Sequence, residues 1–408
     1  MQNHIHIAIP LLDELENLDL LFQNLASQTL RDFSVYLCVN QPDEWWNDKI
    51  KKAICVRNQQ SIEFIIAAKK TYSFPIFVIN KSSIGQGWSN KKQGVGWARK
   101  TLMDEISINA NPTDIIISLD ADTQFSPTYF ERIEGYFSKN QQIDCLSNPY
   151  YHPLNKSEQA NRAILRYEIY MRYYLLNLFR INSPYAFSAL GSAIAFRISA
   201  MHRIGGFTPK KSGEDFYFLQ KMVKYRGIGI WNKEKVFPAA RFSDRVFFGT
   251  GPAMIKGNSG DWSSYPIYPM ELFDKIHEFY QLIPELFKGN INTQIDQFVG
   301  NMNFRNELWE KLRSNNKDLA HFSKAVHDYF DGLRILQFLK QNHQNDIDEV
   351  SLINFLRSDY GKGISENIIE KINFKSNTIE ELNAIRDYLC SLEDQKREQQ
   401  QFVTWKIS

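Results

Sequence analysis

Ile115-Ile-Ile-Ser-Leu-Asp120-Ala-Asp122 combines a strand signal with a pair of carboxylates. A short apolar run bounded by polar residues predicts a buried strand of an α/β sheet, and such sheets bind ligands beyond the carboxyl ends of their strands. Asp120 and Asp122 stand at that end, on one side of the extended chain. Carboxylate oxygens suit Mg²⁺ or Mn²⁺, whose remaining positions are usually filled by water and substrate phosphates. The stretch therefore predicts a metal and diphosphate site, although Asp-x-Asp also occurs where a strand simply turns into a loop.

The composition is that of a globular protein with little net charge. A chain of 408 residues exceeds the size of one hydrophobic core, so two or three domains are expected. Hydrophobic residues make up 43% and aromatic residues 14%, which is enough for packed cores. The net charge of +2 gives no argument for nucleic acid as a partner. The four cysteines form no CxxC pair and are typical of reduced core residues.

The amino-terminal sequence Met1-Gln-Asn-His-Ile leads directly into a strand-like alternation, without a basic and apolar leader. We therefore expect no secretion and a cytoplasmic location. No segment reaches the roughly 18 consecutive apolar residues that a membrane span needs. Peripheral contact with the inner face of the membrane is left open as an alternative.

The first 150 residues alternate strand and helix signals, which predicts a doubly wound, mostly parallel sheet. Strands are expected at Ile5 to Ile9, Ser34 to Val39, Pro75 to Ile79 and Ile115 to Leu119. Residues 157–180 carry apolar side chains at helical spacing. From about Tyr265 the glycine-rich loops cease and helical periodicity continues, so a mainly α-helical carboxyl-terminal region is expected.

Several further motifs follow one another along the chain. They are Ile7-Ala-Ile-Pro10 with Asp13-Glu14, Phe33-Ser-Val-Tyr-Leu-Cys-Val-Asn40, Gly94-Val-Gly-Trp-Ala-Arg99, Asp120-Ala-Asp122, Gly191-Ser-Ala-Ile-Ala-Phe-Arg197, Gly205-Gly-Phe207 and Gly213-Glu-Asp215. Over about 255 residues their order resembles that of family 2 glycosyltransferases, which use nucleotide sugars. The resemblance implies a GT-A (Rossmann-like) catalytic domain over residues 1–264 and a helical region over residues 265–408. One departure is Asn40-Gln41, where the family often has an Asp.

The resemblance also implies roles for individual residues. Asp122, with Asp120, would bind Mn²⁺ or Mg²⁺, Asp215 would be the catalytic base, and Glu214 would orient the acceptor. The donor-binding residues that we expect are Pro10, Glu14, Asn40, Lys92, Arg99, Asp120 and Arg245.

Two of these residues stand in glycine-containing loops. Lys92 ends a glycine- and lysine-rich stretch, residues 84–92, which could bind phosphate or could be an ordinary surface loop. Arg245 stands within residues 241–251, where the family often has a lid over the diphosphate.

The chemistry of glycosyl transfer agrees with these roles. Charge builds on the leaving diphosphate, where a cation neutralises it, while a carboxylate base activates the acceptor hydroxyl. A single base without a second carboxylate nucleophile favours inversion. We therefore expect a metal-dependent, hexosyltransferase-type enzyme (EC 2.4) that moves one sugar from a nucleoside diphosphate sugar to a glycan or lipid-linked acceptor, as in polysaccharide biosynthesis.

Three alternatives stand beside this prediction. Nucleotidyltransferases that make sugar nucleotides usually open with a glycine-rich basic loop, whereas Leu11-Leu-Asp-Glu-Leu-Glu16 is acidic and contains no glycine. A carbohydrate-binding or scaffold protein could keep the fold without catalysis. Finally, Ser212-Gly-Glu-Asp215 fits the start of a helix, where such residues bind free amides, and this role is compatible with catalysis.

Overall fold

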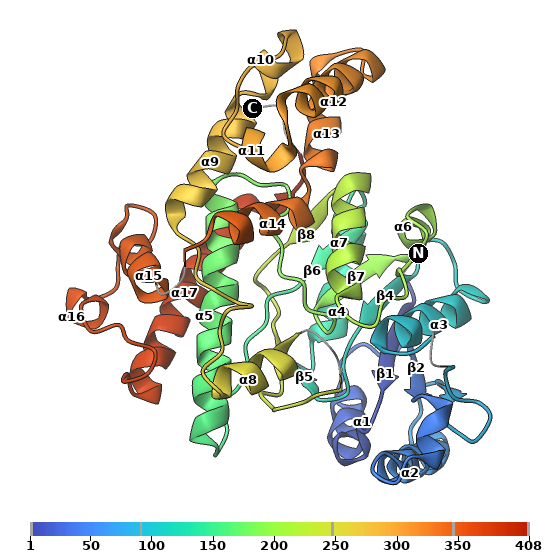
Figure 1. Cartoon of the computed structure of the whole chain (residues 1–408). Coiled ribbons are helices and arrows are strands. Elements are labelled where there is room, and N and C mark those ends of the chain that lie inside the picture. Colours follow the sequence, from blue (N-terminus) through green and yellow to red (C-terminus); the bar gives the residue numbers. More distant parts are fainter. Residues whose placement is uncertain (1–2, 90–91, 246–248, 345–346, 406–408) are drawn as a thin grey trace. The chain divides into compact units, whose positions relative to one another are not determined.

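The computed structural model describes residues 3–89, 92–245, 249–344 and 347–405. The chain forms two compact units. Unit 1 comprises residues 1–164 and 188–256, and unit 2 comprises residues 165–187 and 257–408. The sheet strands between residues 5 and 230 lie in unit 1, and Figure 1 shows that the chain beyond residue 257 is mainly helical.

The core of unit 1 is a mostly parallel sheet. In spatial order its strands are β8 (Ile228–Ile230), β6 (Cys145–Ser147), β7 (Ile194–Arg197), β4 (Ile115–Ser118), β1 (Ile5–Leu11), β2 (Phe33–Asn40) and β3 (Ile76–Lys81). β7 runs antiparallel to β4 and β6, whereas β1 runs parallel to both of its neighbours. β1, β2 and β4 are buried along almost their whole length, as is usual for parallel strands covered on both faces.

Helices connect and cover these strands. Those of unit 1 are η1 (Leu15–Asn17), α1 (Leu18–Ala26), η2 (Asp43–Asn47), α2 (Lys52–Thr71), α3 (Val95–Ser107), α4 (Tyr129–Lys139), α6 (Ile198–Arg203) and α7 (Glu214–Tyr225). α2 packs on β2 and β3, and α3 packs on β1 and β2. Two further helices, α5 (Glu158–Arg180) and α8 (Thr250–Asn258), have residues in both units.

The strand order places a switch point between β1 and β4. The chain moves outward from β1 to β2 and β3 and then returns to the other side of β1 as β4. Open α/β sheets bind ligands at the carboxyl ends of the strands beside such a reversal. The register pairs Ala8 with Ser118, so Glu14 and the Asp120–Asp122 segment follow two adjacent strands.

A separate two-stranded ribbon begins just after the carboxyl end of β4. β5 (Thr123–Phe125) pairs antiparallel with β9 (Val236–Pro238), and Thr123 lies opposite Pro238. Because the two strands run in opposite directions, the residue before Thr123 and the residues after Pro238 leave the ribbon at the same end. Asp122 and the segment that begins near Arg241 are therefore brought to one place.

Unit 2 is built from helices around an apolar core. They are α9 (Met270–Gln281), α10 (Ile283–Lys288), α11 (Asp296–Val299), α12 (Met302–Asn315), α13 (Leu319–Tyr329), α14 (Gly332–Asn342), α15 (Asp348–Arg357), α16 (Glu366–Ile369) and α17 (Ile379–Gln400), followed by the short strand β10 (Phe402–Val403). Arg172 on α5 pairs with Glu168 and with Glu393 of α17, and all three side chains are buried. A buried charge needs such partners, so these ion pairs restrict how α17 can pack on α5.

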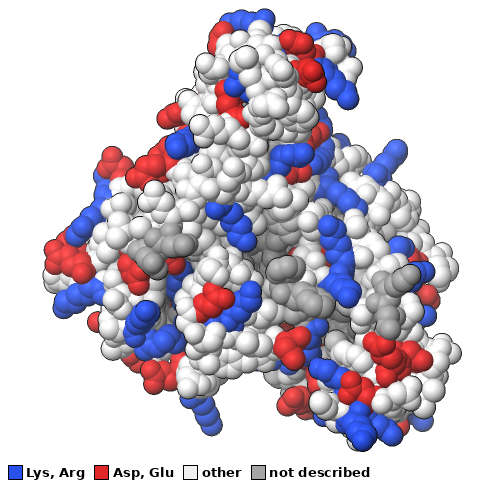
Figure 2. Space-filling view, in the orientation of Figure 1, with Lys and Arg blue, Asp and Glu red and all other residues white. Residues whose placement is uncertain are grey.

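The predicted fold class is confirmed. The chain has an α/β, mostly parallel sheet followed by a helical carboxyl-terminal region. The domain boundary between residues 264 and 265 stays a prediction, because compact packing does not show independent folding. Among the described residues, none of the helices has both the length and the apolar character required to cross a membrane. Over the face drawn in Figure 2, acidic and basic side chains are interspersed, in line with the net charge of +2.

Candidate active site

A buried arginine joins the end of β4 to the start of α7. Arg99 on α3 donates from Nε to Glu214 Oε1 at 2.9 Å and from Nη2 to Asp120 Oδ1 at 2.6 Å. Its Nη1 donates to Ser118 Oγ. Burial works against the charged form, but Asp120 and Glu214 outweigh it and raise the pKa of Arg99. One guanidinium therefore holds the predicted metal ligand Asp120 and the predicted acceptor-side Glu214.

Glycines make room for this arrangement. A Cβ at Gly191 would lie 2.3 Å from Arg99 Nη2, and a Cβ at Gly96 would lie 2.2 Å from the carbonyl oxygen of Lys210. Real Cβ atoms do not approach other atoms so closely, so each position needs glycine for steric reasons. Gly96 thus lets α3 lie against the loop that leads into α7, and Gly191 leaves room for the guanidinium of Arg99.

The Glu214-Asp215 pair opens α7. Gly213 caps the helix with φ of 74°, and Asp215 Oδ1 accepts a hydrogen bond from the Phe216 amide at 2.7 Å. Burial, followed by the charge of Glu214, raises the pKa of Asp215 to about 7. Burial also raises the pKa of Glu214. A carboxylate with a pKa near neutral pH accepts a proton readily, which is the property required of a general base.

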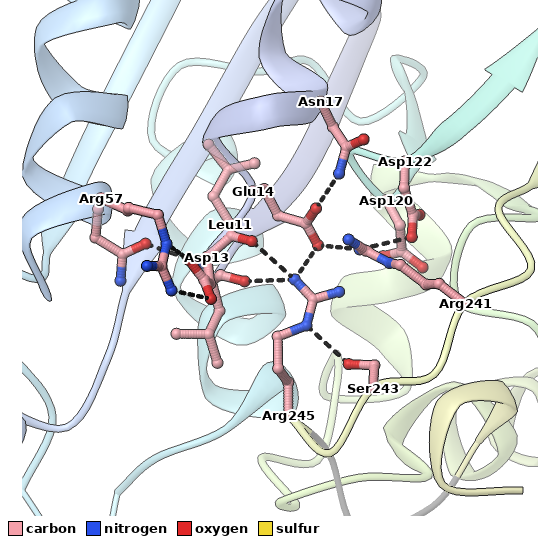
Figure 3. Close-up of polar contacts among 12 residues, drawn as sticks. Leu11, Asp13, Glu14, Asn17, Arg57, Asp120, Asp122, Arg241, Ser243 and Arg245 are labelled. Atoms are coloured by element: carbon pink, nitrogen blue, oxygen red, sulfur yellow. Dashed lines mark hydrogen bonds and ion pairs between the residues drawn. The ribbon is translucent and has the colours of Figure 1, made fainter. Parts of the chain in front are cut away.

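A second cluster surrounds Asp122. Figure 3 shows the guanidinium of Arg241 between the carboxylates of Glu14 and Asp122. Arg241 Nη2 lies 2.6 Å from Asp122 Oδ2 and donates to Glu14 Oε1 at 2.5 Å. The same Glu14 oxygen accepts from Arg245 Nη1 at 2.5 Å, and Asn17 Nδ2 donates to Glu14 Oε2 at 2.6 Å. Burial raises the pKa of Asp122 to about 7, with Arg241 opposing this shift and nearby carboxylates adding to it.

Arg245 ties its own segment to the loop that follows β1. Its Nη1 also donates to the carbonyl oxygens of Leu12 at 2.7 Å and Asp13 at 3.2 Å, and its Nε donates to Ser243 Oγ at 2.9 Å. Asp13 adopts a φ of 59° and accepts two hydrogen bonds from Arg57, at 2.5 and 2.8 Å. The loop after β1 is thus held by Arg245, which binds its backbone, and by Arg57 of α2, which binds the Asp13 side chain.

Arg241 was not among the residues expected from sequence. Its only sequence signal was its place in the same segment as Arg245, three residues after β9. The contact with Asp122 depends on the register of the β5–β9 ribbon. The residues near Arg241 in sequence do not predict that register.

Asn40 is enclosed by protein groups. Its Nδ2 donates to the Leu11 carbonyl oxygen at 2.8 Å, its Oδ1 accepts from Trp88 Nε1 at 3.1 Å, and the residue is 3% exposed. The amide thereby fastens the carboxyl end of β2 to β1 and to the loop that contains Trp88. Its predicted role in donor binding stays a prediction.

Gly85 and Gly87, in the loop before Lys92, lie against η2; residues 90 and 91 of that loop lie outside the described residues. Asp43 Oδ1 accepts hydrogen bonds from the amides of Gly85 at 2.8 Å and Gly87 at 3.3 Å. The sequence suggested that such backbone amides could donate hydrogen bonds to phosphate. In the structure these two donate to a carboxylate of the same chain. Lys92 itself is exposed, with Nζ 5.5 Å from the centre of the Trp97 ring.

Pro10 lies opposite Cys38 near the end of β1. Within the described part of the chain, neither Pro10 nor Lys92 is recorded in contact with Asp120, Asp122 or Glu214. The other predicted site residues fall into the two clusters around Arg99 and Arg241, apart from Asn40.

The donor chemistry at β4 fits a hard divalent cation. Asp120 and Asp122 supply carboxylate oxygens, the ligands that Mg²⁺ and Mn²⁺ prefer. Among the residues that the structure describes, no group of three His, Cys, Asp or Glu side chains is placed to hold a metal ion. The protein would therefore contribute two carboxylates, with phosphate and water oxygens completing the coordination, and each carboxylate already has one oxygen on a guanidinium.

Comparisons with known proteins add little to this geometry. No family model and no curated protein matches the chain. A solved structure of residues 1–349 of Staphylococcus aureus TarS in complex with UDP-GlcNAc is 12% identical, with a TM-score of 0.40, and the match covers 95% of this chain and 92% of that one. The Pyrobaculum calidifontis mannosyltransferase PcManGT, solved with GDP-Man and Mn²⁺, is 10% identical, with a TM-score of 0.37 and coverage of 98% and 88%. Likenesses of this degree support no conclusion about activity.

Proposed function

We propose that this chain is a metal-dependent family 2 glycosyltransferase of the GT-A fold. It transfers one hexose from a nucleoside diphosphate sugar to the hydroxyl of a glycan or lipid-linked acceptor, with inversion at the anomeric carbon. The observation that carries the proposal is the placement of Asp120, Asp122 and the Glu214-Asp215 pair around Arg99 and Arg241 at the carboxyl ends of β1 and β4.

One group of residues acts on the acceptor hydroxyl, and another acts on the leaving diphosphate. Asp215, whose pKa is raised to about 7, takes the proton of the acceptor hydroxyl as that oxygen attacks the anomeric carbon. Arg241 and Arg245 provide positive charge for the diphosphate that leaves. A divalent cation bound by Asp122 and Asp120 would supply Lewis-acid stabilisation of the same diphosphate.

The ion pairs of the other carboxylates with Arg99 support the proposal of inversion. Asp120 and Glu214 both bind the guanidinium of Arg99, which is 2% exposed, and this ion pair makes either oxygen a poor covalent nucleophile. Asp215 instead accepts a hydrogen bond from the neighbouring Phe216 amide. A single free base acting on the acceptor supports direct displacement.

The wider assignments extend this proposal. We place the enzyme in the cytoplasm, with access to acceptors of polysaccharide biosynthesis that include lipid-linked glycans at the inner face of the membrane. Residues 1–264 form the catalytic domain and residues 265–408 a helical domain. These assignments follow from the type of reaction and not from a contact in the structure.

The proposal is tested with a panel of UDP- and GDP-sugars in the presence of Mn²⁺ or Mg²⁺. Thermal shift reports binding, nucleotide release reports turnover, and NMR of the product reports the anomeric configuration. Asp122→Ala should lose the metal-dependent thermal shift. Asp215→Asn should keep that shift and lose turnover by ~100-fold or more, since general base catalysis contributes about 10²–10⁴-fold.

Asp104→Ala is the matched control, because Asp104 is an exposed carboxylate on α3 that pairs only with Lys100 in the recorded contacts. It should behave as the native chain does. If no nucleotide sugar binds with either metal, the proposed function is wrong. If a nucleotide sugar binds and the native chain does not turn it over with any acceptor or with water, the carbohydrate-binding alternative is the better account.

A further inference from the structure

Asp122, the carboxylate that we assign to the metal, already forms an ion pair with Arg241. Arg241 Nη2 lies 2.6 Å from Asp122 Oδ2, and Asp122 is 14% exposed. The same nitrogen donates to Glu14 Oε1 at 2.5 Å, where Glu14 is 8% exposed. Arg241 therefore occupies the space between two carboxylates that are largely shielded from water (Figure 3).

The chain holds Arg241 in this position from both sides. The antiparallel ribbon places Asp122, just before Thr123, beside the residues that follow Pro238. On the other side of Arg241, Arg245 donates to the Leu12 carbonyl oxygen and to Glu14 Oε1. The Arg241–Asp122 pair is thus supported by a ribbon register and by a second arginine, and it is not an isolated surface contact.

We propose that Arg241 and a divalent cation compete for Asp122, so that metal binding requires Arg241 to move to another anion. This inference rests on the proposed function. Two cations that share one carboxylate repel each other, and burial strengthens that repulsion because water screens it poorly. A guanidinium displaced from Asp122 has a matched partner in the diphosphate of the donor, since its planar fork suits phosphate oxygens.

The competition makes metal and donor binding cooperative. Without a diphosphate, the cation must displace Arg241 from Asp122, so metal alone binds weakly. With a diphosphate present, Arg241 has a new partner and the cost of its displacement falls. By linkage, the metal must strengthen nucleotide binding by the same factor as the nucleotide strengthens metal binding. Arg241 is in this sense the residue that couples the two sites.

The test measures free Mn²⁺ by electron paramagnetic resonance, with and without UDP and GDP, for the full-length native chain and for Arg241→Gln. The native chain should bind Mn²⁺ weakly alone and about tenfold more tightly with the nucleotide that it accepts. Arg241→Gln should bind Mn²⁺ alone about tenfold more tightly than the native chain does, and its gain from the nucleotide should be smaller than that of the native chain, because only the direct contact between phosphate and metal remains. Arg241→Lys keeps a cation beside Asp122 and should stay close to the native chain in the absence of nucleotide.

Arg132→Gln is the matched control, because Arg132 also pairs with a glutamate, Glu234, but lies on α4 away from both clusters. It should leave Mn²⁺ binding unchanged. Circular dichroism establishes that Arg241→Gln is folded, and if it is not, Arg241→Met, which also removes the cation, takes its place. Tighter binding of Mn²⁺ alone by that variant supports the competition, and native-like binding overturns it.

The experiment distinguishes failure of the competition from failure of the proposed function. If Mn²⁺ binds equally well to the native chain and to Arg241→Gln, and Asp122→Asn abolishes that binding, the competition is refuted while the proposed metal site stands. If Mn²⁺ binds to none of the variants and no nucleotide changes this, both the competition and the proposed function fail.

Discussion

Arg99 Nε donates to Glu214 Oε1 over 2.9 Å, while another nitrogen of the same guanidinium binds Asp120. These two carboxylates come from different parts of the chain, one after β4 and the other at the start of α7. A buried ion pair contributes little net stability but imposes a strict geometry, because a mispaired charge in the interior is costly. Arg99 is therefore a positioning residue that fixes the distance between the proposed metal ligand Asp120 and the helix start that carries the proposed base.

Replacing Arg99 with Lys should damage both stability and activity. An ammonium is a compact point charge and cannot reach Ser118, Asp120 and Glu214 at once. We expect a loss of about 3 kcal/mol in the free energy of unfolding, as for other broken buried pairs. We also expect turnover to fall ~100-fold, because both sides of the site lose their alignment. Thermal denaturation and the rate of nucleotide release measure the two effects.

The control for this variant is Arg31→Lys, since Arg31 is exposed and donates to the carbonyl oxygen of Ala26. Its stability and turnover should match those of the native chain. An Arg99→Lys enzyme with native turnover would show that the bridge to Glu214 is not required for catalysis.

Gly191→Ala should disturb Arg99 without changing any charge. The new methyl group would lie 2.3 Å from Arg99 Nη2, so the guanidinium must move away from Asp120. Overpacking of this kind costs about 1–3 kcal/mol, and turnover should fall with it. The measurement is the melting temperature together with kcat at saturating donor.

Gly135→Ala is the matched comparison, because Gly135 lies within α4 and a Cβ there meets nothing within 4 Å. A helical glycine is less favourable than alanine by up to ~1 kcal/mol, so this variant should be slightly stabilised and fully active. Equal turnover in the two alanine variants would contradict the steric role of Gly191.

The pH dependence of turnover should reveal Asp215. The base must be ionised, and its pKa is raised to about 7, so kcat/KM should fall about tenfold for each pH unit below 7. Asp215→Asn should lose activity at every pH. A flat profile between pH 5 and 8 in the native enzyme would exclude Asp215 as the base.

The free energy of unfolding should also depend on pH through Asp215, but it should be higher at low pH, where turnover is low. The pKa of Asp215 is about 7 in the folded chain, against 3.8 for an unperturbed aspartate, so the folded state binds more protons between these values. Stability therefore falls as the pH rises from about 4 to 7. Asp215→Asn removes the buried charge and should raise the melting temperature at pH 8 by about 2–4 °C, with little change at pH 5. A lower melting temperature at pH 8 would contradict this sign.

Asn40→Asp replaces the buried amide at the end of β2 with a carboxylate. In this chain a carboxylate oxygen would replace the amide that donates to the Leu11 carbonyl, so two acceptors would face each other in a buried site. We expect a loss of about 1–3 kcal/mol in stability and an unchanged preference between UDP and GDP. A change in that preference, measured by thermal shift with each nucleotide, would show instead that Asn40 contacts the donor.

Local patterns sufficed for the fold class. The buried strands β1, β2 and β4 were predictable because apolar runs bounded by polar residues reflect burial directly, and their order along the chain indicated the parallel sheet. The same patterns placed Asp120 and Asp122 at a strand end and Glu214 and Asp215 at the start of a helix. These inferences needed only residues that are neighbours in sequence.

The sequence alone therefore determined the mostly parallel sheet, four of its strands and the carboxylates that follow β4 and open α7, because burial and helix initiation are encoded locally. Only the tertiary structure decided that Arg99 lies between Asp120 and Glu214, and that Arg241 reaches Asp122 while Arg245 binds the loop after β1. The physical reason is that an ion pair between distant residues depends on the register of a ribbon and on the close approach permitted by glycines. Neither the ribbon register nor the close approach at the glycines can be predicted from the residues next to each arginine in sequence.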